Sequence, residues 1–571
     1  MRIALLGGGP AALFMYKRLT ESGHPGLEID IFEKKEHLGN GMPYSTEGAN
    51  DEHITNVSDH EIPEIVMSIE DWVKVAPKEL LARFAITPEN FNEFKVLPRL
   101  FFGQYLSSQF KLLIDRATKA GIKTAVHLNS NVIDVADHPG QDEVSVETAD
   151  KEVMRFDKVV ICTGHSWPVT YEGRVAGYYD SPYPPAKLKL KLNHPVAIKG
   201  SSLTAIDAVR TLARNNGMFI TGENGSLTFQ ISEESRDFKL VMHSIDALLP
   251  GIRFHLEDTH LANDSLLTPG EIKEHREANN GFLSLDFVFE KNFKEIFRDK
   301  DPAFYDQIKD LSLEEFVESM MALRQRLDPF VLFRAEYKEA EKSIRRQEPV
   351  YWKEMLAVLS FTMNYPAKYL SAEDMQRLTK VLMPLISIVI AFVPQSSACE
   401  MLALYEAGIL EIVAVDQASE VVPGEKVGGI YRYTSEDGAR RQIPYTTFVN
   451  CIGQPRLSYE DFPFKSLINS NTISPAHVKF QSPTAGLIAL KEGSGDVTTD
   501  GQGNYYLKVP GITINDNFQV VDLYGISSKR IYIMAVPYIG GYNPDYSGLD
   551  FCEEASGLIL ERILDDTAPG I

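Results

Sequence analysis

The chain has 571 residues, of which 44% are hydrophobic and 24% charged, and this composition is typical of a globular protein with more than one domain. Its formal net charge of −22 disfavours nucleic acid and anionic membranes as partners, because both bind basic protein surfaces. The longest apolar run, at 382–394, is too short to span a bilayer, and no signal peptide precedes the first strand, so we expect a cytoplasmic protein with no membrane contact.

The first predicted element is a buried parallel strand at residues 3–6, followed by a glycine-rich turn and a helix. The turn has the pattern Gly7-x-Gly9-x-x-Ala12, in which glycine allows a tight turn and the close approach of a pyrophosphate to the main chain. A second strand ends at Glu33, where a carboxylate can accept hydrogen bonds from a ribose. The chain therefore begins with a dinucleotide-binding unit.

The residues that follow this unit are predicted to form a long loop, two helices and a small antiparallel sheet. The loop at 38–65 is rich in Gly, Asn, Asp and Ser, and a loop of that length beside a cofactor strand is more often functional than idle. Apolar spacing predicts helices at 68–84 and 101–120. Short alternating runs at 126–157 indicate a hairpin or meander before a buried strand at 158–163.

A second strand–turn–helix unit begins with a strand at 196–198. Its turn is Gly200-Ser201-Ser202, a helix follows, and the next parallel strand ends near His243. Ser202 stands where a dinucleotide-binding loop would have its second glycine, so a side chain enters the space next to a pyrophosphate. The pattern predicts a second dinucleotide-type unit with an altered loop.

The stretch at 256–381 differs from the rest because Glu, Lys, Phe and Leu recur in it at helical spacing. It is predicted to be a mostly helical insertion. The run at 386–394 is predicted to return to a strand, followed by a helix and another strand. The chain is predicted to end with a strand, a glycine turn and a helix.

Together these motifs resemble two-dinucleotide flavoproteins, and within them the FAD–NAD(P)-binding proteins related to flavin-dependent N-hydroxylases and class B monooxygenases. The resemblance rests on GGGPAA, LGNGMPYS with HITNV, LPRLFFGQYL, VVICTGH, VAIKGSSLTAIDAV and VNCIGQP. It implies an α/β fold with two Rossmann-like dinucleotide-binding domains (FAD/NAD(P)-binding fold) and a mostly helical insertion. The implied domains are an FAD-binding domain at 1–165 with 440–571, an NAD(P)-binding-like domain at 190–255 with 385–440, and an insertion at 256–384 that forms a lid or substrate region.

The resemblance implies that FAD lies along the first unit. The residues that it implies in cofactor binding are Gly7, Gly8, Gly9, Pro10, Ala11, Ala12, Glu33, Lys34, Arg99, Val132, Cys162, Thr163, Gly164 and Gly541. The candidate catalytic residues are His53, Asn56 and Asp545. No metal site is predicted.

For the second unit the resemblance implies a nicotinamide dinucleotide as reductant. The residues implied in its binding are Gly200, Ser201, Ser202, Leu203, Thr204, His243 and Arg253. No acid directly follows His243 and a cation stands nearby at Arg253, which favours NADPH over NADH, whereas Asp246 opposes this preference. The alternative is that the unit is a structural remnant that binds no dinucleotide.

If both cofactors bind, the expected chemistry is hydride transfer from the nicotinamide to the flavin. The four cysteines form no C-x-x-C pair, which disfavours a disulfide reductase. We therefore expect an FAD-dependent, NAD(P)H-linked oxidoreductase, and specifically a class B-like monooxygenase that oxygenates a small-molecule amine or carbonyl. The Phe-x-Gly-x-x-x-His signature of Baeyer–Villiger enzymes is missing from 164–200, which disfavours that subfamily.

Two alternatives stay open at this stage. One is an oxygen-independent flavin reductase or dehydrogenase. The other is a flavin-binding module with little turnover, whose helical insertion recruits a partner. The sequence identifies neither the substrate nor the oligomeric state.

Overall fold

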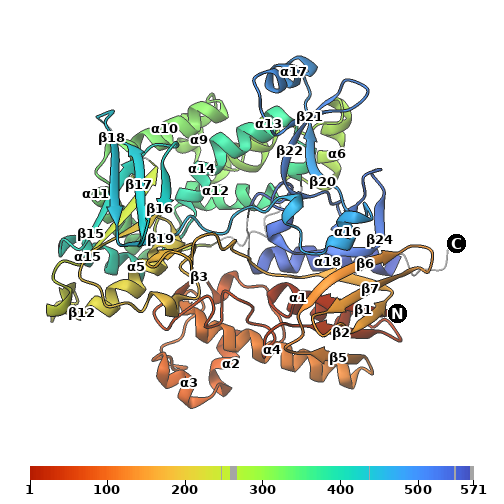
Figure 1. The fold of residues 1–571 in the computed structure, drawn as a ribbon, viewed down its shortest axis with the longest axis horizontal. Helices are drawn as coiled ribbons and strands as arrows, with labels where there is room; N and C mark the ends of the chain where they lie inside the picture. Colours follow the sequence, from red (N-terminus) through yellow and green to blue (C-terminus); the bar gives the residue numbers. More distant parts are fainter. Residues whose placement is uncertain (246, 258–265, 365, 436, 546–547, 566–571) are drawn as a thin grey trace.

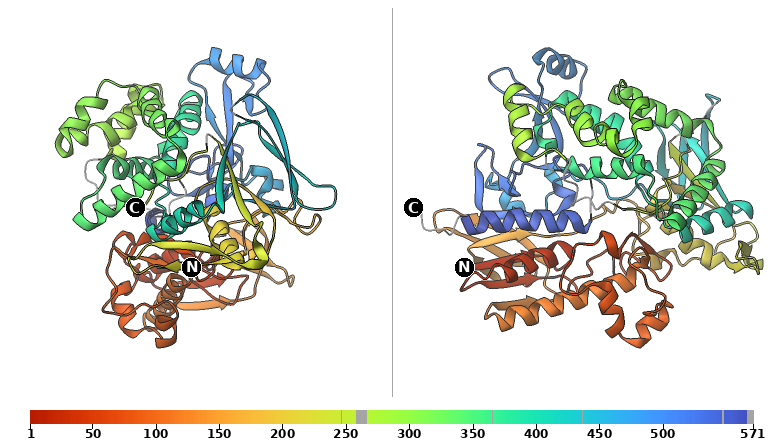
Figure 2. Two further views of the ribbon diagram at one scale, coloured as in Figure 1. Left: turned by 90° about the vertical axis from the view of Figure 1, so that its left-hand side faces the viewer. Right: turned by 180° about the vertical axis from the view of Figure 1, so that it is seen from behind.

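The computed structural model describes residues 1–245, 247–257, 266–364, 366–435, 437–545 and 548–565 (Figure 1). Asp246 and the stretch 566–571 of the predicted FAD-binding domain lie outside these residues. Two sheets, one parallel except for an antiparallel edge strand and the other all parallel, occupy two ends of the molecule, and a helical region, green in the figures, lies on one side of them (Figures 1 and 2). Among the described residues, no helix has both the length and the apolar character needed to cross a membrane.

The first sheet has the strand order β23-β24-β9-β1-β2-β5. Its central strand β1 (Arg2–Leu6) pairs in parallel with β2 (Glu28–Phe32) on one side and β9 (Lys158–Ile161) on the other. The remaining strands are β5 (Lys123–His127), β24 (Ser527–Ile533) and β23 (Gln519–Val521). Because the chain leaves β1 toward β2 while β9 lies on the opposite side, the carboxyl ends of β1 and β9 form a switch point, where such sheets bind ligands.

Helices and a small antiparallel sheet surround the first sheet, which explains why the central strands β1 and β9 are almost fully buried. The helices are α1 (Pro10–Glu21), α4 (Arg99–Lys119) and α18 (Leu549–Asp565), and α1 packs against both of the others. The small sheet of β6 (Val132–His138), β7 (Glu143–Thr148) and β8 (Val153–Phe156) contacts β1, β9 and β24. The meander predicted at 126–157 is thus confirmed.

The second sheet has the order β10-β19-β11-β14-β15, and all its pairs are parallel. Its strands are β10 (Tyr178–Tyr179), β19 (Thr447–Asn450), β11 (Pro195–Lys199), β14 (Lys239–Ile245) and β15 (Leu410–Val415), with helices α5 (Leu203–Asn216) and α15 (Gln395–Glu406) beside them. The domain boundary predicted at residue 440 needs correction here, because β19 pairs with β11 rather than with the first sheet.

Four further antiparallel sheets are small and separate from the two large ones. They are β3 (Ile54–Ser58) with β4 (Val96–Pro98); β12 (Gly217–Thr221) with β13 (Leu227–Ile231); β16 (Glu420–Pro423), β17 (Gly429–Thr434) and β18 (Arg440–Tyr445); and β20 (Pro475–Lys479), β22 (Tyr505–Ile512) and β21 (Val497–Thr499). None of these four sheets was predicted from the sequence.

The insertion is helical, as predicted. Its helices are α6 (Pro269–Ala278), α7 (Leu285–Phe289), α8 (Phe297–Lys300), α9 (Pro302–Ile308), α10 (Leu313–Arg326), α11 (Pro329–Arg346), α12 (Tyr351–Thr362), α13 (Ala372–Arg377) and α14 (Met383–Val389). Two more helices, α16 (Lys465–Asn469) and α17 (Pro483–Lys491), lie toward the C-terminus. One apolar core runs from the first sheet into this helical region, and a second core fills the interior of the second unit.

Two predicted elements differ from the structure. The run at 386–394 is not a strand, because its first half belongs to α14; an all-apolar run fits a buried helix as well as a buried strand. The helix predicted at 68–84 is divided into α2 (Ile69–Val75) and α3 (Lys78–Arg83). Pro77 separates them, since the residue before a proline is driven out of the helical conformation.

Candidate functional site

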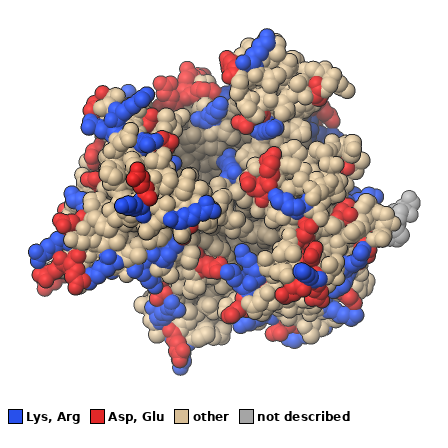
Figure 3. All heavy atoms as spheres, in the orientation of Figure 1, with Lys and Arg blue, Asp and Glu red and all other residues tan. Residues whose placement is uncertain are grey.

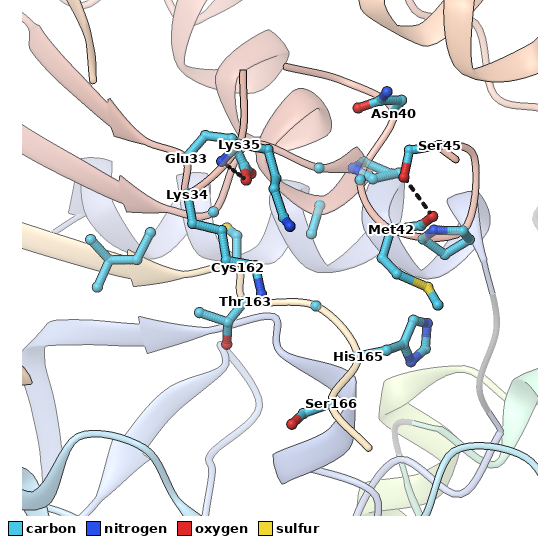
Figure 4. A pocket seen from close by; sticks show the side chains of 18 of the residues that line it. Glu33, Lys34, Lys35, Asn40, Met42, Ser45, Cys162, Thr163, His165 and Ser166 are labelled. Atoms are coloured by element: carbon cyan, nitrogen blue, oxygen red, sulfur yellow. Dashed lines mark hydrogen bonds between the residues drawn. The ribbon is translucent and has the colours of Figure 1, made fainter. Parts of the chain in front are cut away.

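A cavity of about 770 Å³ lies at the carboxyl ends of β1, β2 and β9, at the switch point of the first sheet (Figure 4). Its walls come from the glycine turn before α1, the loop at 40–47, the segment at 162–166, and residues near 463, 537 and 550. The space-filling view shows a deep hollow at the centre of one face, between the two units and the helical region (Figure 3). This volume lies within the usual range of small-molecule and cofactor sites.

The glycine turn is shaped by close approach of other main-chain segments. Gly7 has a φ of +112°, and its N–H donates to the carbonyl of Phe32 at 2.8 Å. A Cβ atom on Gly7 would lie 2.6 Å from the carbonyl oxygen of Cys162, and one on Gly9 would lie 3.3 Å from the Cα of Gly41. The turn therefore presents bare main chain to the cavity at the N-terminus of α1, an arrangement that suits a pyrophosphate.

Glu33 lies at the end of β2, where its carboxylate lines the cavity and only 9% of the residue is exposed. The N–H of Gly8 donates to its Oε2 at 2.7 Å, and the N–H of Lys35 donates to its Oε1 at 2.9 Å (Figure 4). Each carboxylate oxygen keeps a further lone pair for a ligand. Glu33 is thus held in place by main chain and is oriented to accept hydrogen bonds from ribose hydroxyls.

Two side-chain atoms at the cavity wall are buried and have no hydrogen-bond partner among the described residues. They are Oγ1 of Thr163 and Nδ1 of His165. Burial lowers the pKa of His165, although a hydrogen bond with Gln454 partly offsets this effect, so the ring is neutral at pH 7. Because buried polar atoms are nearly always paired, these two atoms indicate that a polar ligand completes the site. The residues present therefore fit an FAD.

The structure brings together most of the predicted FAD-binding residues. Those that line the cavity are Gly7, Gly9, Pro10, Ala11, Glu33, Lys34, Val132, Cys162, Thr163 and Gly164. Gly8 and Ala12 are not among the lining residues. The N–H of Gly8 donates to the Glu33 carboxylate, and Ala12 is buried in α1. Burial raises the pKa of the Cys162 thiol, and that of Cys552 to about 12, so both cavity cysteines stay protonated rather than acting as thiolates.

Several cavity residues were not among the predicted site residues. The main group is the loop at 40–47, whose Asn40, Met42 and Ser45 face the cavity (Figure 4). Gly39 and Gly41 allow this loop to turn back on itself, with φ values of +94° and +56°. The length and glycine content of the loop indicated a functional role, but only the fold shows which of its side chains reach the site.

The second unit repeats the main-chain geometry of the first. Gly200 has a φ of +106°, its N–H donates to His243 O at 2.8 Å, and a Cβ on it would lie 2.8 Å from Cys451 O. Ser202 precedes α5, caps it with no side-chain hydrogen bond, and is exposed; Leu203 and Thr204 form the first turn of this helix. The turn at Gly200 therefore forms the same kind of main-chain cradle as the turn at Gly7, whereas Ser202 places a small side chain at the position of Gly9.

The two units touch through the loops that follow their switch-point strands. The Ser166 N–H donates to Oε1 of Gln454 at 3.0 Å, and Nε2 of Gln454 donates to Ser166 O at 2.6 Å. Nε1 of Trp167 donates to Gly453 O at 3.1 Å. Ser166 lines the first cavity, and Gly453 lies next to the first turn of α5. The two candidate cofactor sites are thus joined directly by hydrogen bonds.

Arg99 and His53 lie in a buried polar cluster between the units, outside the residues that line the cavity. Arg99 forms a bidentate ion pair with Asp207 of α5, with Nη1 at 2.6 Å from Oδ2, and donates from Nε to Ile54 O. The Tyr183 hydroxyl also donates to Asp207. With its guanidinium engaged in this way, Arg99 joins the two units, and its predicted contact with a cofactor phosphate needs correction.

The imidazole of His53 is fully buried and its tautomer follows from its partners. The Asn50 N–H donates to Nδ1 at 3.0 Å, so the ring proton sits on Nε2, which lies 3.2 Å from Asp207 O and 3.1 Å from Oγ1 of Thr211. Burial lowers the pKa of His53, although the nearby Asp207 raises it in part. His53 is therefore a neutral structural group in this arrangement, and its predicted catalytic role has no support from the geometry.

We expect His53 to make the protein less stable in mild acid. Its pKa is lowered in the folded chain, so below about pH 6.5 the unfolded state binds a proton that the folded state does not. The loss of stability as pH falls reaches at most about 1.4 kcal/mol per pH unit until the folded pKa is passed. Urea unfolding at pH 5, 6 and 7 should show a smaller pH dependence for His53→Gln than for the natural chain; an equal slope would contradict the assignment.

The other predicted site residues lie apart from the cavity lining. Arg253 is 6% exposed and pairs with Glu61 and with Oγ of Ser58, so its cation is not available to a 2′-phosphate. His243 stacks on Tyr431 at a ring distance of 3.9 Å, and burial lowers its pKa to about 4. Arg253 therefore links the second unit to the segment at 56–61, and His243 packs against β17, which corrects their predicted contact with a dinucleotide.

Three predicted site residues remain: Asn56, Asp545 and Gly541. Asn56 in β3 accepts at its carbonyl from Arg253. The Asp545 N–H donates to Oδ1 of Asn364 at 2.9 Å. Gly541 is tightly packed, since a Cβ on it would lie 2.5 Å from Pro510 O. None of the three is among the described residues that line the cavity, so their assigned roles stay predictions.

The fold and the cavity define a protein with the FAD/NAD(P)-binding fold and an added helical region. In agreement, residues 4–166 match the family model described as FAD-NAD(P)-binding, and residues 268–390 match the YdhS-like middle domain. The resemblance predicted from the motifs is therefore confirmed, as are the α/β fold and the helical insertion. The family description also agrees with the predicted cofactors, FAD and a nicotinamide dinucleotide.

Individual proteins extend this similarity over most of the chain. Uncharacterized protein YdhS of Escherichia coli (strain K12) is 28% identical over 474 residues, which are 82% of this chain and 85% of that protein. The ornithine N-hydroxylase of Kutzneria sp. 744, solved with reduced FAD, NADP⁺ and L-ornithine, has a TM-score of 0.50 at 14% identity, covering 99% of both chains. L-lysine 6-monooxygenase from Pseudomonas syringae has a TM-score of 0.45 at 12% identity, covering 99% of both chains. At 14% identity, the likeness to the Kutzneria structure shows a shared fold.

Proposed function

We propose that this chain is an FAD-dependent oxidoreductase reduced by NADPH or NADH, and that it acts as a class B-like monooxygenase on a small-molecule amine or carbonyl. The observation that carries the proposal is the repetition of one cradle. Gly7 and Gly200 occupy equivalent switch points, and the loops after the neighbouring strands are hydrogen-bonded to each other through Gln454 and Ser166. Hydride transfer between two cofactors requires two dinucleotide sites held in a fixed relation to each other, which these hydrogen bonds support.

In this proposal the chain supplies binding, orientation and exclusion of water. The bare main chain at Gly7 and Gly9 receives the FAD pyrophosphate, and the fixed carboxylate of Glu33 receives the ribose. Thr163 and His165 offer their unpaired polar atoms to the bound group. When bound, FAD supplies a two-electron centre that accepts hydride from the nicotinamide and reacts with O2.

The finer proposal of a monooxygenase is supported by the fold that the chain shares with the Kutzneria ornithine N-hydroxylase. It is also supported by the state of the cavity cysteines, because their raised pKa values disfavour a thiolate that would react as in a disulfide reductase. In the same proposal the helical region at 256–384 closes the hollow over the substrate, which would shelter the reacting centre from water.

The decisive experiment is a visible absorption spectrum of the purified chain, before and after anaerobic addition of NADPH. We expect a yellow protein whose flavin band bleaches with NADPH. Admission of O2 with a set of candidate amines and ketones should then restore the band and give an oxygenated product. A colourless protein that does not take up added FAD would refute the proposal. Reduction without oxygenated product, but with fast transfer to an artificial acceptor, would replace the monooxygenase with an oxygen-independent reductase.

A further inference from the structure

We propose that Ser201 and Ser244 bind the adenosine ribose of the nicotinamide dinucleotide and that this pair of hydroxyls determines whether the site accepts a 2′-phosphate. The inference rests on the proposed function, because it names the residues that set the choice of reductant at the second cradle. Ser244 was not among the residues predicted from the sequence.

The first step is that the two units can be matched residue by residue. In the first unit Leu6 is paired with Phe32, and Gly7 N–H donates to Phe32 O at 2.8 Å. In the second unit Lys199 is paired with His243, and Gly200 N–H donates to His243 O at 2.8 Å. The residue after Phe32 is Glu33, and the residue after His243 is Ser244.

The strand on the other side confirms the match. Cys162 N–H donates to Leu6 O at 2.9 Å, and Cys451 N–H donates to Lys199 O at 2.8 Å. A Cβ on either cradle glycine would strike the carbonyl of the corresponding cysteine. Ser244 therefore occupies the position of Glu33, and Ser201 occupies the position of Gly8.

The second step is that the two units differ at both of these positions, and the two differences fit each other. In the first unit the carboxylate of Glu33 accepts from Gly8 N–H, and a Cβ on Gly8 would lie 3.0 Å from the Cβ of Glu33. In the second unit the hydroxyl oxygens of Ser201 and Ser244 lie 2.8 Å apart, and the Ser201 hydroxyl donates to Leu248 O at 2.6 Å. The short side chain of Ser244 thus leaves room that the side chain of Ser201 fills.

The third step concerns charge. A carboxylate at this position binds the 2′- and 3′-hydroxyls of a ribose but repels a 2′-phosphate, which carries negative charge. Two uncharged hydroxyls remove that repulsion. The Ser201 proton is engaged with Leu248 O, so the Ser244 hydroxyl is the one that can turn to donate to a phosphate oxygen. The cation predicted for this phosphate, Arg253, is engaged with Glu61. The preference for NADPH therefore comes from the uncharged side chain at position 244, and we expect it to be about tenfold, the equivalent of about 1.4 kcal/mol.

The test introduces the glycine and glutamate of the first unit, Gly8 and Glu33, at the equivalent positions of the second unit. The double variant Ser201→Gly with Ser244→Glu recreates the glycine–glutamate contact, and Ser244→Asp, with Ser201 kept, places a shorter carboxylate at the same point. Thr498→Glu on β21, an exposed position of another sheet, controls for the added negative charge. The Kd values of NADP⁺ and NAD⁺ are measured by calorimetry on the FAD-loaded proteins, and the flavin absorbance checks that the first site is intact.

We expect the natural chain and Thr498→Glu to bind NADP⁺ about tenfold more tightly than NAD⁺. Both carboxylate variants should weaken NADP⁺ at least tenfold and leave NAD⁺ unchanged or tighter. An unchanged ratio in variants that keep their flavin would overturn the inference while leaving the proposed function in place. If the yellow natural chain bound neither nucleotide, the inference and the nicotinamide half of the proposed function would both be wrong.

Discussion

Gly9→Val is expected to abolish FAD binding while leaving the chain folded. Gly9 has ordinary extended φ and ψ values, and its Cβ would meet only the Cα of Gly41 at 3.3 Å, so a side chain is tolerated by the backbone but enters the space for the pyrophosphate. We expect the Kd for FAD to rise at least about 100-fold, the equivalent of about 2.7 kcal/mol. The measurement is titration of the apoprotein with FAD, followed by quenching of flavin fluorescence.

Gly140→Val is the matched control. Gly140 lies on an exposed turn, no atom stands within 4 Å of its Cβ position, and it is remote from the cavity lining. It should bind FAD as the natural chain does. Gly7→Val is a poor choice for this purpose, since its φ of +112° and the carbonyl of Cys162 would make the change disrupt folding. Undiminished FAD affinity in folded Gly9→Val would rule out the assigned pyrophosphate position.

Arg99→Met is expected to destabilise the protein by about 3–5 kcal/mol, because it leaves the carboxylate of Asp207 buried without its cation. The two side chains are 16% and 6% exposed and their ion pair joins the two units. Equilibrium urea unfolding followed by circular dichroism measures the change. The double variant Arg99→Met with Asp207→Leu should recover most of the loss, since an apolar pair removes the uncompensated charge.

The same pair should govern stability in strong acid. Burial alone would raise the pKa of Asp207, but Arg99, His53 and the Tyr183 hydroxyl outweigh it, so the pKa is held below its usual range. A carboxyl of this kind stabilises the fold above its unfolded pKa of about 3.9, and the contribution disappears as pH falls through the folded pKa. The matched control is Lys123→Met, which removes an exposed ion pair with Glu28. It should change neither the free energy of unfolding nor its pH dependence measurably. Equal effects of the two variants would show that the buried cluster does not join the units.

The sequence was most informative where local main-chain geometry decides the structure. The run at 3–6, the glycine at position 7 and the acid at position 33 specify a strand, a tight turn and a ribose acceptor without help from distant residues. Pro10, Ala11 and Val132, which the resemblance implied in cofactor binding, line the cavity beside this turn. The spacing of apolar residues likewise predicted the helical insertion.

Sequence reasoning failed where the same residue types serve more than one purpose. An arginine near a cofactor motif can bind a phosphate or a carboxylate. Arg99 pairs with Asp207 and Arg253 pairs with Glu61, and both partners are far away in the chain. An apolar run can form a strand or a helix, and residues 386–389 form part of α14. In each case the partner that settled the outcome could not be identified from spacing.

By itself, then, the sequence determined the class of the first nucleotide site, because each of its defining residues acts within one strand–turn–helix unit. Only the tertiary structure decided which residues complete that site and how it meets the second one. The structure brings residues near 463, 537 and 550 to the cavity wall and places Gln454 against Ser166. It also shows that Ser244 occupies the position in the second unit that Glu33 has in the first. All of these relations involve segments that are far apart in the chain. Such contacts depend on how whole elements pack, and no local pattern of residues encodes them.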